Sequence, residues 1–195
     1  MTVADRIAAY LRETRDTLSA TAESCSEEIA RAATAVADSV RGGGKVLICG
    51  NGGSAADSQH LAAELVSTLT LDRLRPAIPA VALTTDTSIL TAVSNDFGFE
   101  GVFVRQVEAL GTAGDVLIGI STSGNSADVV LAMEQATRQG MRTVALTGET
   151  GGKLAPLADV AILVPSSDTS HVQEAHLAVE QLIAFLVEDE LYPRR

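Results

Sequence analysis

The stretch Lys45–Ser54 decides the fold: it reads KVLICGNGGS and joins an apolar run to a loop of glycine, asparagine and serine. A nearly continuous apolar run is typical of a parallel strand that helices cover on both faces. The loop stands where such a strand would enter a helix. Glycines there let the backbone approach an anion closely, and the N-terminus of the following helix presents unpaired N–H groups. The stretch therefore predicts a strand–loop–helix unit suited to a small phosphate ester.

A second loop of the same kind follows the apolar run Asp115–Ile120 and reads STSGNS over residues 121–126. Its serine and threonine hydroxyls can donate to phosphate oxygens without the bulk of a cation. Either loop alone is equally well explained as a turn or a helix cap, because glycine and serine are common in both. Two such loops at the same position of an α/β pattern favour phosphate binding.

Apolar runs and helical periodicities alternate along the chain. Two N-terminal helices are expected within residues 1–42, because apolar residues recur at helical spacing from Ile29 to Val40. The fold class is α/β: a single doubly wound domain over residues 1–195, with a five-stranded parallel sheet flanked by helices in its core of residues 43–190. The predicted strands are Val46–Cys49, Ala77–Leu83, Val116–Ile120, Thr143–Leu146 and Ala161–Val164, and the predicted helices are Ser54–Val66, Glu100–Leu110, Ala127–Arg138 and Thr169–Glu190.

Composition narrows the classes of function. Hydrophobic residues make up 46% of the 195 residues, which excludes a mainly disordered chain, and no apolar run is long enough for a membrane helix. The net charge of −11 argues against a nucleic-acid partner, because phosphate backbones are bound by clustered Lys and Arg. Two cysteines, Cys25 and Cys49, lack metal-ligand spacing. We therefore expect a cytoplasmic protein with reduced thiols, no membrane partner and no nucleic acid.

Polar residues near the two loops are the candidates for chemistry. His60 and Glu64 are four residues apart and share a helix face, although an exposed pair on a solvated surface has the same spacing. Gln173 and Gln181 stand on the last predicted helix, where polar residues are ordinary on an outward face. The segment Asn95–Gly98 is most simply a turn signal.

The last predicted helix also carries an apolar stripe. Its members recur at spacings of four, three, four and three residues, which is a helical period. We expect this stripe to be buried in a helical bundle or a subunit contact, and its length favours a symmetric oligomer. The stripe consists of Val172, His176, Val179, Ile183 and Leu186.

Several longer strings carry a family resemblance. CGNGGSAADSQHLAAEL, LTTDTSILTAVSNDFGFE, GDVLIGISTSGNSADV, VALTGETGGKLA and VPSSDTSHVQEAHL resemble the sugar isomerase (SIS) domain family, and within it the bacterial phosphoheptose isomerases. The resemblance runs from about residue 41 to 186. It implies an aldose–ketose isomerase that converts sedoheptulose 7-phosphate to D-glycero-D-manno-heptose 7-phosphate, an early step of nucleotide-activated heptose synthesis. It also implies a cytoplasmic homotetramer whose active sites lie at subunit contacts.

The resemblance assigns roles by position. Glu64 falls on the catalytic glutamate, the base that moves a proton between C1 and C2 through a cis-enediol. Zinc, present in some members, would be held by His60, Glu64, Gln173 and the residue at position 181. The implied substrate-binding residues are Asn51, Gly52, Gly53, Ser54, Glu64, Asn95, Asp96, Ser121, Thr122, Ser123, Ser126 and Gln173.

Position 181 departs from the family pattern. The family places a histidine there as general acid and fourth zinc ligand, whereas this chain has Gln181. An amide can form hydrogen bonds but cannot exchange a proton near pH 7, and it is a poor zinc ligand. The alternative hypothesis is therefore a catalytically weakened or non-catalytic SIS protein that binds a sugar phosphate or, like some bacterial relatives, a replication initiator.

Overall fold

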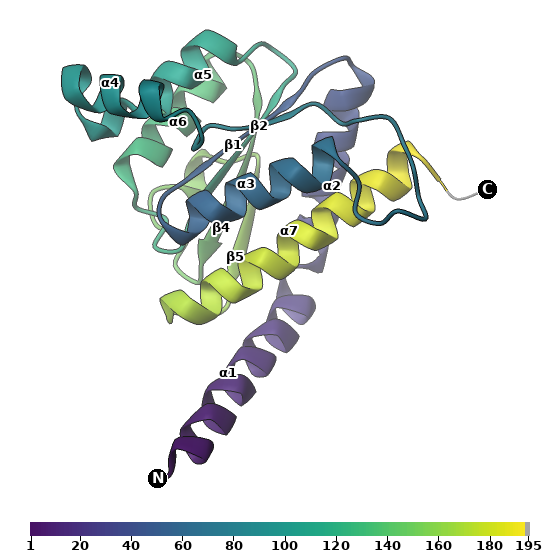
Figure 1. The fold of residues 1–195 in the computed structure, drawn as a ribbon, viewed down its shortest axis with the longest axis vertical. Coiled ribbons are helices and arrows are strands. Elements are labelled where there is room, and N and C mark those ends of the chain that lie inside the picture. The colour runs from purple at the N-terminus through teal and green to yellow at the C-terminus, as the bar shows by residue number, and fades with distance from the viewer. Residues whose placement is uncertain (194–195) are drawn as a thin grey trace.

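The computed structural model describes residues 1–193 and contains a parallel sheet between two layers of helices (Figure 1). Every strand pair is parallel. The elements are α1 (Val3–Ser24), α2 (Ser26–Arg41), β1 (Val46–Gly50), α3 (Gly53–Val66), β2 (Ala80–Ala82), α4 (Thr87–Phe97), the 3-10 turn η1 (Phe99–Gly101), α5 (Val104–Leu110), β3 (Val116–Ser121), α6 (Ala127–Arg138), β4 (Arg142–Gly148), the 3-10 turn η2 (Ala155–Leu157), β5 (Val160–Val164) and α7 (Thr169–Leu191).

The five strands lie in the order β2-β1-β3-β4-β5, which confirms the predicted doubly wound sheet. The chain leaves β1 toward β2 on one side and later reaches β3 on the other side. The strand order therefore reverses between β1 and β3, and ligands of such sheets bind at this reversal, beyond the carboxyl ends of the strands. The first glycine–serine loop follows β1 and the second follows β3, so both stand at this point.

Alternate side chains of the central strands enter two separate cores. Ile48 and Ile118 face the layer formed by α2, α3 and α7, where Leu61 and Ile183 also lie. Leu47 and Leu117 face the opposite layer, formed mainly by α5 and α6. Burial on both faces explains why the strands read as continuous apolar runs rather than as alternating patterns.

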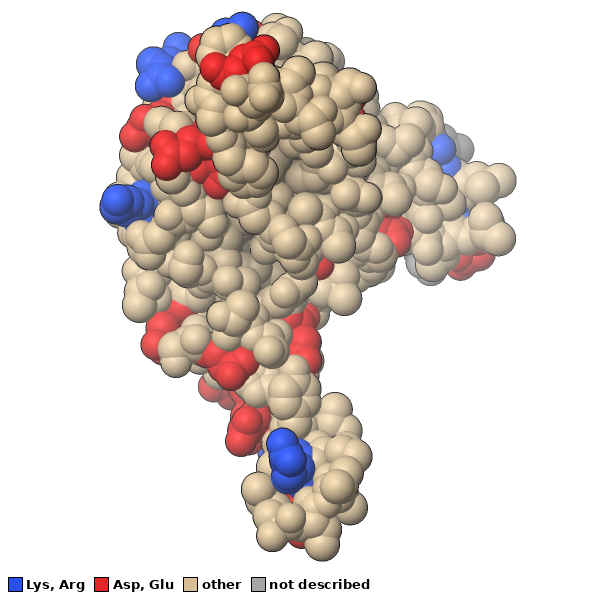
Figure 2. Space-filling view, turned by 60° about the vertical axis from the view of Figure 1, so that its left-hand side comes forward, with Lys and Arg blue, Asp and Glu red and all other residues tan. Residues whose placement is uncertain are grey.

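Helix α1 projects away from the sheet, with its N-terminal end far from the domain (Figure 1). Figure 2 shows acidic side chains gathered where this helix joins the body. Several apolar residues of α1 are exposed: Val3 is 73% exposed, Ile7 56% and Leu11 61%. Within residues 1–193, no helix combines the length and apolar character that crossing a bilayer requires.

Three differences from the predicted elements concern the segment before β3. The first is that β2 spans only Ala80–Ala82 of the predicted strand Ala77–Leu83. Helix α4 was not predicted, because Thr87–Phe97 contains few strong helix formers and ends in a turn-like sequence. Asp86 caps it by accepting from the N–H of Ile89 at 2.9 Å, and the turn signal at 95–98 is in fact the helix end, where Gly98 has φ 84°. The predicted helix 100–110 is shorter, because a 3-10 turn precedes α5.

The apolar stripe of α7 is covered by the domain itself. Val172, Val179 and Ile183 are each at most 1% exposed and pack in the cores of the same chain. Of the two predicted alternatives, burial against neighbouring helices is therefore the one observed, and these residues give no support for a subunit contact. The apolar residues of α7 that remain exposed are on its other faces: Leu177, Leu182 and Phe185.

Candidate functional site

The two loops are held next to each other by the pairing of β1 with β3. Gly50, the last residue of β1, pairs with Ile120, so Asn51 and Ser121 begin neighbouring loops. Gly52 adopts φ 56°, a left-handed conformation that costs glycine little. Helix α3 then begins at Gly53 without a side-chain cap, so its first N–H groups face the loop.

The second loop brings three serine hydroxyls together. The hydroxyl of Ser121 lies 2.9 Å from that of Ser126 and 3.5 Å from that of Ser123. Ser126 holds the N-cap position of α6, but its side chain does not bond the N–H groups of the helix. Hydroxyls and helix N–H groups are therefore available on one side of the loop, which is the combination that binds phosphate. Thr122 is half-buried between them.

Gln173 on α7 reaches across to the first loop. A Cβ atom added at Gly53 would lie 1.7 Å from the Gln173 amide nitrogen, so only glycine leaves room for this side chain. The same helix passes close to the second loop. A Cβ atom added at Gly148 would lie 3.3 Å from Val172, and the N–H of Gly148 donates to the Thr122 carbonyl at 2.9 Å. The predicted residues Asn51, Gly53, Ser121 and Gln173 thus line one region.

His60, Glu64 and Gln181 form a cluster between α3 and α7. His60 Nε2 lies 3.6 Å from a Glu64 carboxylate oxygen and 2.5 Å from the Gln181 amide nitrogen. The amide nitrogen can only donate, so this contact requires the lone pair of His60 Nε2. The side chains of His60 and Glu64 are 39% and 21% exposed, which leaves both accessible to a small molecule. The structure thus brings together His60, Glu64 and Gln181, three of the four residues that the resemblance assigned to the metal site.

The donor set of this cluster fits a divalent cation in part. His60 and Glu64 are ordinary zinc ligands, and their separation of 3.6 Å allows both to contact one ion. Gln173 and Gln181 could complete the set only through amide oxygens, which are weak ligands for zinc. Across residues 1–193, no three His, Cys, Asp or Glu side chains converge as a metal-binding group.

Two buried carboxyl groups lie behind the cluster. Asp57, one turn before His60, is 7% exposed and Glu180 is fully buried. Burial raises the pKa of Asp57 to about 6, which the charge of His60 opposes. Burial and the nearby Asp57 raise the pKa of Glu180 to about 9, so this group is neutral at pH 7. Asp57 could not be identified from the sequence, because its place on a predicted helix does not show that its side chain is buried.

An ion pair fixes the far end of α3 to α7. Arg75 Nε lies 2.7 Å from a Glu188 carboxylate oxygen, and both side chains are at most 2% exposed. The same guanidinium donates to the backbone carbonyls of Glu64 and Leu65 at 2.7 and 2.8 Å. It therefore satisfies carbonyls that the end of a helix leaves free. Arg75 holds the backbone of Glu64 in place, a role that a lone arginine in a loop does not reveal in the sequence.

Asn95 and Asp96 lie outside this region. Both are exposed on α4, and the Asn95 amide donates to Asp96 at 2.8 Å. Figure 1 shows α4 at the edge of the domain, well separated from α7. Within one chain, the described contacts do not bring these two residues to the loops.

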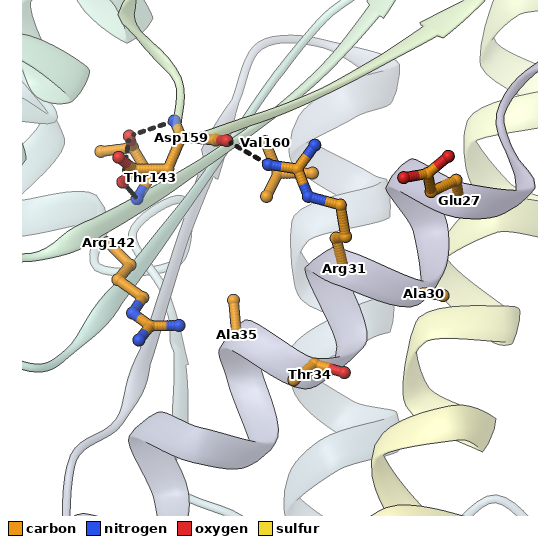
Figure 3. Close-up of a pocket in the computed structure, with 9 residues that line it drawn as sticks. All are labelled: Glu27, Ala30, Arg31, Thr34, Ala35, Arg142, Thr143, Asp159 and Val160. Atoms are coloured by element: carbon orange, nitrogen blue, oxygen red, sulfur yellow. Dashed lines mark hydrogen bonds between the residues drawn. The ribbon is translucent and has the colours of Figure 1, made fainter.

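A separate cavity of about 530 Å³ lies at the opposite end of the sheet, between α2 and the first residues of β4 and β5 (Figure 3). Arg31 and Arg142 line it together with Glu27 and Asp159, so its formal charges balance. Arg31 donates to the Asp159 backbone carbonyl at 3.1 Å. This cavity lies at the amino ends of the strands, whereas ligands of doubly wound sheets bind beyond the carboxyl ends, where the candidate site lies.

Comparison with known proteins agrees with this geometry. Residues 9–148 match the SIS domain. The chain belongs to the SIS-domain family. A phosphoheptose isomerase of Akkermansia muciniphila is 57% identical over 166 residues, which cover 85% of each protein. A phosphoheptose isomerase of Geobacter sulfurreducens is 50% identical over 189 residues, or 97% of this chain and 99% of that protein.

Solved structures of SIS-domain proteins have the same fold over almost the whole chain. The phosphoheptose isomerase of Neisseria gonorrhoeae is 43% identical, with a TM-score of 0.90 over 96% of this chain and 100% of that one. The phosphoheptose isomerase of Francisella tularensis is 36% identical, with a TM-score of 0.92 over 97% and 100%. These similarities confirm the family resemblance and the doubly wound fold.

Proposed function

We propose that the chain isomerises a seven-carbon sugar phosphate, converting sedoheptulose 7-phosphate to D-glycero-D-manno-heptose 7-phosphate. The observation that carries the proposal is the position of Glu64. Its carboxylate lies beside His60, on the helix that begins at the first loop, and that loop adjoins the serine hydroxyls of the second. Identity of 50% over 189 residues to a protein named phosphoheptose isomerase supports the same reaction.

In the proposed reaction, Glu64 removes a proton from C1 of the ketose while the C2 carbonyl oxygen gains a proton. The product of this step is a cis-enediol. The proton on O1 then leaves, C1 becomes the aldehyde carbon, and Glu64 returns its proton to C2. We assign the proton transfer to O2 to His60, because it lies beside Glu64 and Gln181 has no titratable proton.

Zinc is the cofactor that this arrangement would accept, through His60 and Glu64 with amide oxygens from Gln173 and Gln181. When bound, the ion would polarise the sugar carbonyl. The two amide ligands lead us to propose weak binding. In this proposal the side chains and backbone of the protein, rather than the ion, position the sugar, transfer the proton and hold the phosphate.

We further propose a homotetramer in the cytoplasm. The exposed apolar residues of α1 and of the outer faces of α7 support an assembly, because a lone chain leaves them in contact with water. Two free, buried cysteines are compatible with a reducing compartment. In the tetramer, Asn95 and Asp96 on the projecting α4 would reach the site of a neighbouring subunit. Light scattering at micromolar concentration should give four times the subunit mass of 20.2 kDa, and a monomer would contradict the proposal.

The test of the reaction is aldose formation from sedoheptulose 7-phosphate by the purified chain, followed by NMR or by a coupled assay. We expect turnover that depends on Glu64. Binding of the sugar phosphate without turnover, in the presence and absence of added zinc, would instead support the non-catalytic alternative.

A further inference from the structure

Asn51 and Asp128 connect the two loops directly. Asn51 follows β1, whereas Asp128 lies in the first turn of α6, immediately after the second loop. The Asn51 amide nitrogen donates to both carboxylate oxygens of Asp128, at 2.9 and 3.0 Å. This side-chain pair therefore joins the first loop to the helix that follows the second, in addition to the pairing of β1 with β3.

The carboxylate of Asp128 is itself held in place. Asp128 is 4% exposed, and one of its carboxylate oxygens accepts a hydrogen bond from the N–H of Val129 at 3.0 Å. It also lies at the N-terminus of a twelve-residue helix, whose dipole favours a negative charge there. An acidic side chain in a first helical turn is common, and nothing in the sequence shows that this one pairs with Asn51.

The chemistry of the pair decides which way the Asn51 amide faces. An ionised carboxylate only accepts hydrogen bonds, so the amide nitrogen must point toward Asp128. The amide oxygen then points away from Asp128. The reverse orientation would set three acceptor oxygens against one another. Only one orientation of the Asn51 amide forms hydrogen bonds with the carboxylate.

We propose that Asp128 is a positioning residue that fixes Asn51 as an acceptor for a hydroxyl of the bound sugar. The inference rests on the proposed function, since it concerns the same sugar phosphate. An acceptor oxygen repels a phosphate oxygen and attracts a hydroxyl. The first loop therefore recognises the polyol end of the ligand, while the hydroxyls and N–H groups of the second loop hold its phosphate.

The test compares two probes, sedoheptulose 7-phosphate and inorganic phosphate, by calorimetry on the native chain and its variants. Asp128→Asn keeps the shape but no longer dictates the orientation of the Asn51 amide. We expect the apparent Kd for the sugar phosphate to rise about tenfold, as for the loss of one hydrogen bond, while that for inorganic phosphate changes less than twofold. The matched control is Asp115→Asn, which removes a buried carboxylate at the other end of the sheet and should leave both values unchanged.

An exchange variant separates positioning from a simple structural role. Asn51→Asp combined with Asp128→Asn restores a donor facing a carboxylate and still leaves an acceptor oxygen toward the site. We expect it to recover most of the sugar-phosphate affinity that Asn51→Asp alone loses. The inference is overturned if Asp128→Asn leaves the sugar affinity unchanged, or if both probes weaken by the same factor in step with a lower Tm. If the native chain does not bind sedoheptulose 7-phosphate at all, the proposed function fails with it.

Discussion

The second serine loop and the His60–Glu64–Gln181 cluster belong to one site but are built differently. The loop is complete within one chain: its hydroxyls contact each other, and α6 begins directly behind them. The cluster joins side chains from two helices, stays partly exposed, and has an amide where the family resemblance implies an acid. Phosphate binding should therefore tolerate substitutions in the cluster, whereas turnover should be sensitive to each side chain of the cluster.

The largest effect is expected from Glu64→Gln. The amide keeps the shape of the side chain but cannot accept a proton from C1, so turnover should fall by about 10²–10⁴-fold. Phosphate affinity should stay within about twofold, because the second loop is untouched. Steady-state kinetics and calorimetry measure the two quantities. The control is Glu108→Gln, which removes an exposed carboxylate of α5; retained activity in Glu64→Gln would exclude Glu64 as the base.

A gain is expected from Gln181→His. Imidazole can exchange a proton near pH 7 and is an ordinary zinc ligand, so it supplies both properties that the amide lacks. We expect turnover to rise by about 10²-fold and zinc to bind more tightly. Metal titration is the measurement that does not depend on activity. No change in either quantity would show that the residue at position 181 does not limit this cluster, and the acid would have to be sought at His60.

Some of the contacts on which these two predictions depend could be predicted from the sequence, and others could not. The strand–loop–helix units could be predicted because buried parallel strands read as apolar runs and the loops as glycine and serine. The spacing of His60 and Glu64 likewise placed them on one face. Spacing along α7 could not show that Gln181 reaches His60, since that contact depends on how α7 packs against α3.

Other differences between the predicted and the observed structure also have local causes. Helix α4 was missed because its stability comes from the Asp86 cap and the turn at Gly98 rather than from helix-forming residues. The apolar stripe of α7 left a helical bundle and a subunit contact as alternatives, because periodicity identifies an apolar face without saying what covers it. Asn95 and Asp96 were attributed to the site by resemblance alone; one chain leaves them on an exposed helix, so their role in the site stays a prediction.

A smaller effect on binding should distinguish the residues that hold the phosphate from those that hold the sugar. Ser121→Ala and Ser123→Ala each remove one hydroxyl that would donate to phosphate, so the sugar phosphate should bind about 1–3 kcal/mol more weakly per lost bond. Inorganic phosphate should weaken by a similar factor, unlike in the Asp128 variant. Calorimetry with both ligands is the measurement, and Ser24→Ala on α1 is a remote control. Unchanged affinity in both variants would mean that the phosphate lies elsewhere.

The last expected effect is on stability rather than on binding, and it concerns His176, which ties α7 to the strand beside the second loop. Its ring is fully buried and its Nε2 donates to the Thr147 carbonyl at 3.2 Å. Burial lowers the pKa of His176 to about 4, although the bond to Thr147 acts in the opposite direction. A depressed pKa means that the unfolded chain binds the proton more readily. Its contribution to stability is therefore complete above pH 6.5 and is lost as the pH falls toward 4.

His176→Gln keeps a side-chain donor for Thr147 but does not titrate in this range. Between pH 7 and pH 5, the native chain should lose about 2 kcal/mol more unfolding free energy than the variant. Contributions from Asp57 and Glu180 are present in both chains and largely cancel in this difference. Urea unfolding at equal protein concentration gives the values at each pH. Parallel losses in the two chains would show that His176 does not link the α7 side of the site to acid stability.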